Sequence, residues 1–178
     1  MPVEQVNYPH LFAEVTWPWG PTRARFTLLD EPPAGNLISN VNLVPRVGRQ
    51  WVVIRLFDGA WEIPGGTLEP GENYLAGIRR ELIEEAGAIL KNFQCIGGWQ
   101  CYSHAEAPYR PHLPHPESFR LVGTGAVELG QRPSNPKSGE KVTAVEVVSL
   151  DVAVQRFIAQ GRPDLAELYR LAAEITAG

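Results

Sequence analysis

Three glutamates, Glu81, Glu84 and Glu85, stand close together near the end of a predicted helix. Their spacing of three and four residues places the side chains on one face of that helix. Like charges at this spacing cost roughly 0.2 to 0.5 kcal/mol per pair, and acids in the last turn also oppose the helix dipole. A hard divalent cation such as Mg²⁺ reverses this penalty, because it prefers carboxylate oxygens. The cluster therefore indicates a metal site, with a solvated helix surface as the alternative.

The stretch before the helix, PGGTLEPGE, supplies the glycines that a sharp loop beside a ligand requires. Gly65 and Gly66 allow the backbone to approach a ligand closely or to offer a carbonyl oxygen to a metal. Glu72 enters the helix near its positive end and can reach across to orient Arg80. The loop and the helix together favour a divalent metal site over a solvated surface.

The helix that carries these acids is predicted to run from Asn73 to Ala86. Apolar residues recur along it at steps of three and four, which is typical of a helix packed on a sheet. Gly87 stands where a helix commonly ends with a left-handed residue. The apolar positions are Leu75, Ile78, Leu82 and Ala86.

The segment from Gly66 to Ala88 matches the Nudix box, GX5EX7REUXEEXGU, in which U is a bulky aliphatic residue. The matching positions are Gly66, Glu72, Arg80, Glu81, Leu82, Glu84, Glu85 and Gly87. Ala88 is smaller than the residue that usually ends the box, which predicts looser packing of the last turn and leaves the chemistry untouched. The chain therefore resembles the Nudix hydrolase family in this segment, and the WEIPGG stretch before it resembles the strand and loop that usually lead into the box.

The resemblance implies an α/β fold, namely an α/β/α sandwich around a mixed β-sheet. It also implies a hydrolase, dependent on Mg²⁺ or Mn²⁺, that acts on nucleoside diphosphates linked to another moiety. Carried over position by position, Glu81, Glu84 and Glu85 are expected metal ligands, and the Gly66 carbonyl is a further one. Glu72 and Arg80 are then expected to form a supporting ion pair.

The hydrolysis of a diphosphate bridge needs a base, because the attacking water must lose a proton while cations offset the charge of the phosphates. We expect this base to be Glu81, Glu85 or a glutamate outside the box. Glu140, in the SGEK stretch, is the preferred outside candidate, ahead of Glu117 and Glu106. An ordinary solvated acid is the alternative interpretation of each outside glutamate.

Substrate recognition has weaker signals in the sequence. Trp99 and Tyr102 follow a glycine pair and could stack on a nucleobase, although core packing is the usual role of such residues. A nucleoside triphosphate, ADP-ribose and a dinucleoside polyphosphate all fit the box. The alternative from another class is a catalytically silent Nudix domain that senses a nucleotide or binds a partner; an isomerase-like relative is a third.

The loop from His104 to Ser118 is rich in proline and histidine. Its prolines prevent a helix, so His112 and His115 need not share a face, and a rim over the site is favoured over a metal site. Arg23 and Arg25 share one face of a predicted strand, where contact with water is favoured over contact with phosphate.

The rest of the chain predicts the elements that position the box. Residues 1–35 are expected to be an N-terminal extension with one or two strands, part of the same domain as the Nudix region at 36–178. Strand-like runs cover 36–46, 50–57, 92–103, 118–129 and 141–150. Residues 151–177 predict two helices, the first ended by Gly161 and the second capped by Asp164. A homodimer formed through the N-terminal strands is a further hypothesis.

Length and composition limit the class of protein. The chain has 178 residues, 44% of them hydrophobic, which suits one domain. A net charge of −4 gives no broad basic field, so we expect a small nucleotide as partner and no nucleic-acid polymer. We find no signal peptide or membrane span, and expect a cytoplasmic protein. Cys95 and Cys101 lack the spacing of a metal site and are expected to be buried bystanders.

Overall fold

The computed structural model describes residues 7–18, 21–136, 139 and 141–177. Its strands are β1 (Val15–Trp17), β2 (Thr22–Leu28), β3 (Ile38–Val47), β4 (Gln50–Leu56), β5 (Trp61–Glu62), β6 (Gly65–Thr67), β7 (Ala88–Leu90), β8 (Gln94–Ser103), β9 (Glu117–Leu129) and β10 (Val142–Val148). Its helical segments are η1 (Gly35–Leu37), α2 (Tyr74–Glu81), η2 (Leu82–Ala86), α3 (Leu150–Ala159) and α4 (Pro163–Ala177).

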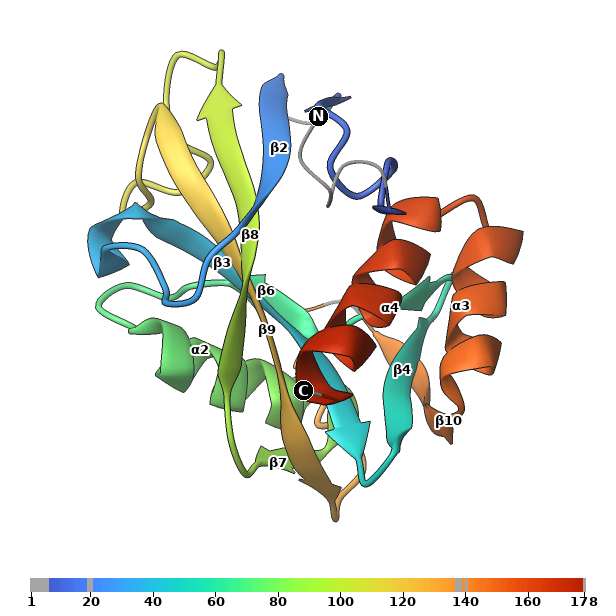
Figure 1. Cartoon of the computed structure of the whole chain (residues 1–178). Coiled ribbons are helices and arrows are strands. Elements are labelled where there is room, and N and C mark those ends of the chain that lie inside the picture. The colour runs from blue at the N-terminus through green and yellow to red at the C-terminus, as the bar shows by residue number, and fades with distance from the viewer. Residues whose placement is uncertain (1–6, 19–20, 137–138, 140, 178) are drawn as a thin grey trace.

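The strands form one mixed sheet in the order β1–β2–β8–β9–β3–β4–β10, which the short strands β5, β6 and β7 join from the side. β3 runs parallel to β9, whereas the other pairs are antiparallel. Helix α2 covers one face of the sheet, and α3 and α4 lie on the other side (Figure 1). The expected α/β/α sandwich around a mixed sheet is confirmed.

Two apolar clusters, one on each face, hold these layers together. Adjacent residues of β4 serve both, because side chains alternate along a strand: Val53 belongs to the cluster under α3 and α4, and Ile54 to the cluster under α2. Ile78 of α2 is buried in the second cluster, and Tyr169 of α4 in the first. The hydroxyl of Tyr169 donates a hydrogen bond of 2.7 Å to the Val52 carbonyl, which satisfies a polar atom in the core.

The N-terminal segment packs between β2 and α4, where it is drawn in dark blue in Figure 1. Phe12 meets Phe26 of β2 edge to face, with ring centroids 5.6 Å apart. The buried carboxylate of Glu167 on α4 accepts hydrogen bonds from the backbone N–H groups of His10 and Leu11, at 2.9 and 2.7 Å. These contacts tie the start of the described chain to α4.

Strands β1 and β2 both lie within residues 1–35, and β1 is at one end of the sheet order. An end strand is the position from which a sheet can extend into a second copy of the chain. A homodimer through these strands stays a hypothesis, and light scattering that shows only monomer would reject it.

Within the described residues, no helix is long and apolar enough to cross a membrane.

The two C-terminal helices divide where predicted, but their boundary differs in one respect. Gly161 follows α3 with a left-handed backbone, φ 78°, as expected for the residue after a helix. The predicted cap at Asp164 is wrong, because α4 already begins at Pro163 and Asp164 lies in its first turn. Proline favours this first position, since its fixed φ suits a helix and its missing N–H group has no intrahelical partner there.

The two cysteines are buried as free thiols. Burial raises the pKa of Cys95, and it raises the pKa of Cys101 to about 11. Because the thiolate is the reactive form, we expect the folded protein to react with a disulfide reagent roughly 100-fold more slowly than an exposed cysteine near neutral pH. Absorbance of the released aromatic thiol measures this rate. The unfolded protein in guanidinium is the control, and fast reaction of the folded protein would show that a thiol is accessible.

Candidate active site

The site is built where the sheet opens between β3 and β4. Among the described residues these strands pair only near their hairpin turn, at Arg46 with Trp51 and Val47 with Gln50. Farther from the turn, β6 pairs with β3 and β5 pairs with β4. The N–H group of Leu43 also donates to the carbonyl of Pro64, at 3.0 Å. Residues 61–67 therefore fill the opening and carry the glycine loop into the middle of the sheet.

The helix that faces this loop begins and ends where the sequence predicts. The Asn73 side chain caps α2 by accepting a hydrogen bond of 2.9 Å from the Ala76 N–H group. Helix α2 continues directly into η2, a single π-helical turn that ends at Gly87, whose φ of 59° is left-handed. The predicted helix from Asn73 to Ala86 and its glycine cap are confirmed. The π-helical turn was not predicted, and such turns are frequent at functional sites.

The acids of the helix turn toward the backbone of the glycine loop. Glu81 and Glu85 are only 7% and 8% exposed. The Glu85 carboxylate accepts a hydrogen bond of 2.9 Å from the Gly65 N–H group. Glu81 lies against Gly66, because a Cβ atom on Gly66 would come within 2.2 Å of Glu81 Oε1. A glycine at position 66 is therefore needed for Glu81 to approach the loop this closely.

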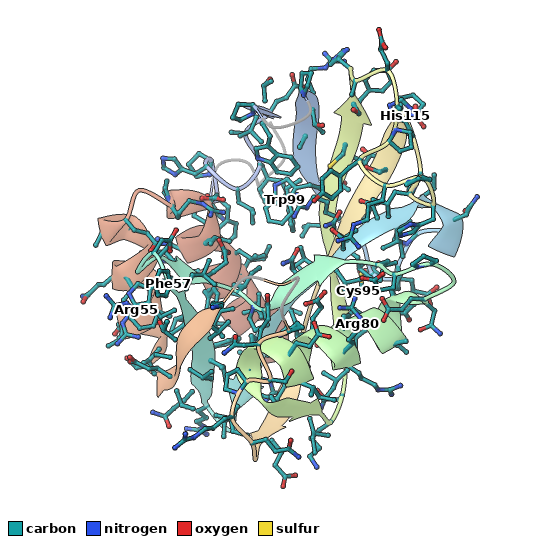
Figure 2. All side chains as sticks on the ribbon, turned by 180° about the vertical axis from the view of Figure 1, so that it is seen from behind. Arg55, Phe57, Arg80, Cys95, Trp99 and His115 are labelled. Carbon is teal, nitrogen blue, oxygen red and sulfur yellow. The ribbon has the colours of Figure 1, made fainter. Side chains whose placement is uncertain are left out.

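Arg80 joins the acids of the box into one network, and Figure 2 shows it on α2. Its guanidinium donates two hydrogen bonds to Glu72, at 2.8 and 2.9 Å, and one of 3.1 Å to the Thr67 carbonyl. Its Nη1 atom also bonds Glu81 at 2.7 Å and Glu84 at 3.4 Å. The structure thus forms the predicted pair of Glu72 and Arg80, and it adds a backbone carbonyl that no side-chain pattern indicates.

These contacts set the charge state of the acids. Hydrogen bonds from Arg80 lower the pKa of Glu72, which stays ionised. Burial raises the pKa of Glu81, and the charge of Arg80 offsets only part of that effect. The hydrogen bonds to Glu72 raise the pKa of Arg80, so its guanidinium stays charged.

The donors around the loop fit a divalent cation in their chemistry. Among the described residues, no three His, Cys, Asp or Glu side chains converge into a ready-made metal cage. Mg²⁺ does not require one, since it is commonly held by one or two carboxylates together with waters and phosphate oxygens. The side chains gathered at the loop are carboxylates, and Nη1 of Arg80 offsets the repulsion between Glu81 and Glu84. This hard oxygen donor set suits Mg²⁺ or Mn²⁺.

The candidate bases outside the box have different positions. Glu140 lies outside the described residues. The described flank of its loop is fixed to the box helix, because the Asn135 N–H group donates to the Glu84 carbonyl at 3.1 Å. The Asn135 side chain also bonds both the N–H and the carbonyl of Val142, at 2.8 and 3.0 Å. Glu106 and Glu117 are exposed.

The two aromatic candidates for substrate binding lie in different environments. Trp99 is 8% exposed and packs against Phe26 and Trp17, with ring centroids 5.0 and 6.3 Å apart. Figure 2 shows it apart from Arg80. Its burial in the core argues against stacking on a nucleobase. Tyr102 is 41% exposed, with its ring centroid 5.1 Å from that of His104, and we keep it as a candidate substrate contact.

The histidines of the loop at 104–118 bond backbone carbonyls. His112 Nε2 is 2.8 Å from the Leu68 carbonyl oxygen, and His115 Nε2 is 3.0 Å from that of Ala105. Leu68 belongs to the segment between β6 and α2, so this loop borders the box. Figure 2 shows His115 well away from Arg80. Arg23 and Arg25 are exposed, in keeping with contact with water.

The chain is similar to known proteins in sequence and in fold. A "Putative 8-oxo-dGTP diphosphatase YtkD" of Bacillus subtilis (strain 168) is 31% identical over 71 residues, which cover 40% of this chain and 45% of that protein. The structure resembles the pyrophosphohydrolase BsRppH of B. subtilis, with a TM-score of 0.56, 17% identity and 76% of each chain covered. It also resembles a Nudix hydrolase of Nitrosomonas europaea, with a TM-score of 0.57, 17% identity, and 78% of this chain and 90% of that chain covered.

These two structural likenesses support the fold. The family model for the NUDIX domain matches residues 39–172, which include most of β3, the box helix and most of α4. The chain therefore belongs to the Nudix family.

Proposed function

We propose that the protein is a pyrophosphohydrolase that cleaves a diphosphate bond in a nucleoside diphosphate linked to another moiety, with Mg²⁺ or Mn²⁺ as cofactor. One observation carries this proposal. The three box acids are intact, and two of them lie buried against the glycine loop rather than in solvent. A solvated helix surface would leave such acids exposed. Nudix hydrolases in general use divalent metal ions, which agrees with this donor set.

In this proposal the residues divide into two tasks. Glu81, Glu84, Glu85 and the Gly66 carbonyl hold the cation. When bound, the cation offsets the charge of the diphosphate and lowers the pKa of a water. Arg80 keeps Glu81 and Glu84 together on the loop side, and Glu72 orients Arg80 through two hydrogen bonds.

The proton of the attacking water must pass to a carboxylate. Glu81 and Glu85 lie close enough to the loop to serve, and Glu140 is the candidate outside the box. We expect replacement of the true base by glutamine to reduce turnover while the protein still takes up the metal. Titration calorimetry with Mn²⁺ on each of the three variants separates the base from a ligand, because loss of a ligand weakens metal binding as well.

The substrate class stays broad. The relative in B. subtilis is named for 8-oxo-dGTP, so oxidised nucleoside triphosphates join ordinary triphosphates, ADP-ribose and dinucleoside polyphosphates as candidates. Tyr102 is the proposed contact for the base. The net charge of −4 favours a small nucleotide over a nucleic-acid polymer.

A panel of these nucleotides, incubated with Mg²⁺ or Mn²⁺ and analysed by chromatographic separation of the nucleotide products, tests the proposal. We expect at least one substrate to be turned over. A silent panel, combined with a nucleotide that raises the melting temperature, would instead identify a Nudix domain that senses its ligand without catalysis.

A further inference from the structure

The short strand β5 leads into the glycine loop, and its edge opposite β4 is hydrogen-bonded to a side chain. One edge of β5 pairs with β4. On the other edge, the Trp61 N–H group donates to Gln160 Oε1 at 2.7 Å, and Gln160 Nε2 donates to the Trp61 carbonyl at 2.6 Å. The primary amide of Gln160 thus bonds Trp61 in the way a neighbouring strand would.

Glu62, the second residue of β5, is bound by a residue close to Gln160 in the chain. Arg162 Nη1 donates a hydrogen bond of 3.1 Å to the Glu62 carboxylate. Arg162 is fixed in turn by Asp164, which accepts its Nε and Nη2 groups at 3.0 and 2.9 Å. Residues 160–164, which we name the α3–α4 corner, therefore contact both residues of β5.

The side chain of Trp61 is fixed as well. The guanidinium of Arg156 on α3 lies 3.9 Å from the centre of its ring, and Arg156 also bonds Glu146 at 2.6 Å. The quadrupole of an indole ring attracts a cation at this distance. Backbone and ring of Trp61 are thus both attached to the α3 side of the sheet.

Only two residues separate β5 from Gly65. Within this short connection, Pro64 accepts a hydrogen bond from Leu43 of β3, and the Gly65 N–H group bonds Glu85. A shift of Trp61 along its strand would therefore move the Gly65 and Gly66 backbone relative to the acids of the box. The α3–α4 corner lies on the opposite face of the sheet from these acids.

We propose that Gln160 is a positioning residue for the metal site: by holding the Trp61 backbone, it fixes the place of the Gly65 and Gly66 backbone against Glu85 and Glu81. The inference rests on the proposed function, since it takes the box and the glycine loop to hold the cation. Gln160 itself touches neither the acids nor the loop. Partners that orient metal ligands from outside typically alter metal affinity by 10- to 100-fold when they are replaced.

The test uses Gln160→Met, which keeps the side-chain volume and removes both hydrogen bonds. Gln155→Met, at an exposed position of α3, the helix that Gln160 directly follows, is the matched control. Isothermal titration of the metal-free protein with Mn²⁺ should show binding about 10-fold weaker for Gln160→Met and unchanged for the control. The Mg²⁺ concentration for half-maximal activity should rise by a similar factor, whereas kcat at saturating Mg²⁺ changes less.

A second variant covers the case in which Gln160→Met does not fold. Gln160→Glu places a carboxylate oxygen against the Trp61 carbonyl oxygen in place of the amide donor, so its Mn²⁺ affinity should be weakened at least as much as that of Gln160→Met. Equal Mn²⁺ affinity in the folded Gln160 variants and the control would overturn the positioning role and leave the proposed function intact. Unfolding of both Gln160 variants would also overturn it, since Gln160 would then be a determinant of stability. Absence of Mn²⁺ binding in the unaltered protein would instead reject the proposed metal site itself.

Discussion

Replacement of Glu85 by glutamine should lower kcat on the best substrate of the panel by a factor on the order of 10² or more, as removal of a catalytic electrostatic group does. Glutamine has the same shape as glutamate, and its amide oxygen can still accept the hydrogen bond that the Gly65 N–H group gives to Glu85. The change therefore removes the negative charge and preserves the contact. The expected loss comes from weaker metal binding, from the missing base, or from both.

Initial rates of nucleotide product formation over a range of Mg²⁺ concentrations measure this effect. Glu14→Gln, at an exposed glutamate far from the box in sequence, is the matched control and should keep full activity. The melting temperature of Glu85→Gln should stay close to that of the unaltered protein. A variant that retains most of its activity at every Mg²⁺ concentration would exclude Glu85 from both proposed roles.

Replacement of Arg80 by alanine should lower the free energy of unfolding by about 3 kcal/mol, because it leaves the partly buried acids of the box without their shared cation. Arg80 donates to Glu72, Glu81 and Glu84 and to the Thr67 carbonyl. Arg80→Lys should recover only part of the loss, since an ammonium group cannot reproduce the two parallel hydrogen bonds to Glu72. Activity should fall in both variants as Glu81 and Glu84 move apart.

Chemical denaturation of the metal-free protein gives the stability difference, and Arg79→Ala provides the matched control. Arg79 is the adjacent residue, carries the same charge and is exposed, so its loss should change stability by no more than about 0.5 kcal/mol. Equal stability of Arg80→Ala and Arg79→Ala would show that the network around Arg80 contributes little. Addition of Mg²⁺ should stabilise Arg79→Ala more than Arg80→Ala. Binding to the native state raises its stability, and only Arg79→Ala keeps the guanidinium that holds Glu81 and Glu84 together as proposed ligands.

The sequence predicts the parts of this site that depend on regular spacing. Helical periodicity and the glycine cap locate the box helix, since a core-facing stripe and a left-handed terminal residue leave clear patterns. The long strands are found for the same reason. β6 was missed because three residues are too few to show alternation, and its pairing depends on how β3 and β4 separate; the strand at β5 was expected only from the resemblance of WEIPGG to the approach to the box.

The positions of single side chains follow from tertiary packing and are harder to predict. The pattern of β8 does not reveal which sheet face lies under the N-terminal segment, so Trp99 and Tyr102 could not be distinguished. The two hydrogen bonds between Gln160 and Trp61 join residues far apart in the chain, so no local sequence pattern predicts them. The box acids were easier to predict because their spacing conflicts with local helix energetics, and such a conflict often marks function.

The way the sheet opens between β3 and β4 has a consequence for how this protein can diversify. Residues 61–67 are bonded to strands on both sides, so inserting or deleting even one residue there would break their pairing with β3 or β4. The proline-rich loop at 104–118 joins two strand ends at the rim and tolerates changes in length far better. We therefore expect insertions in related proteins at the rim, while the segment that faces the box acids keeps a constant length.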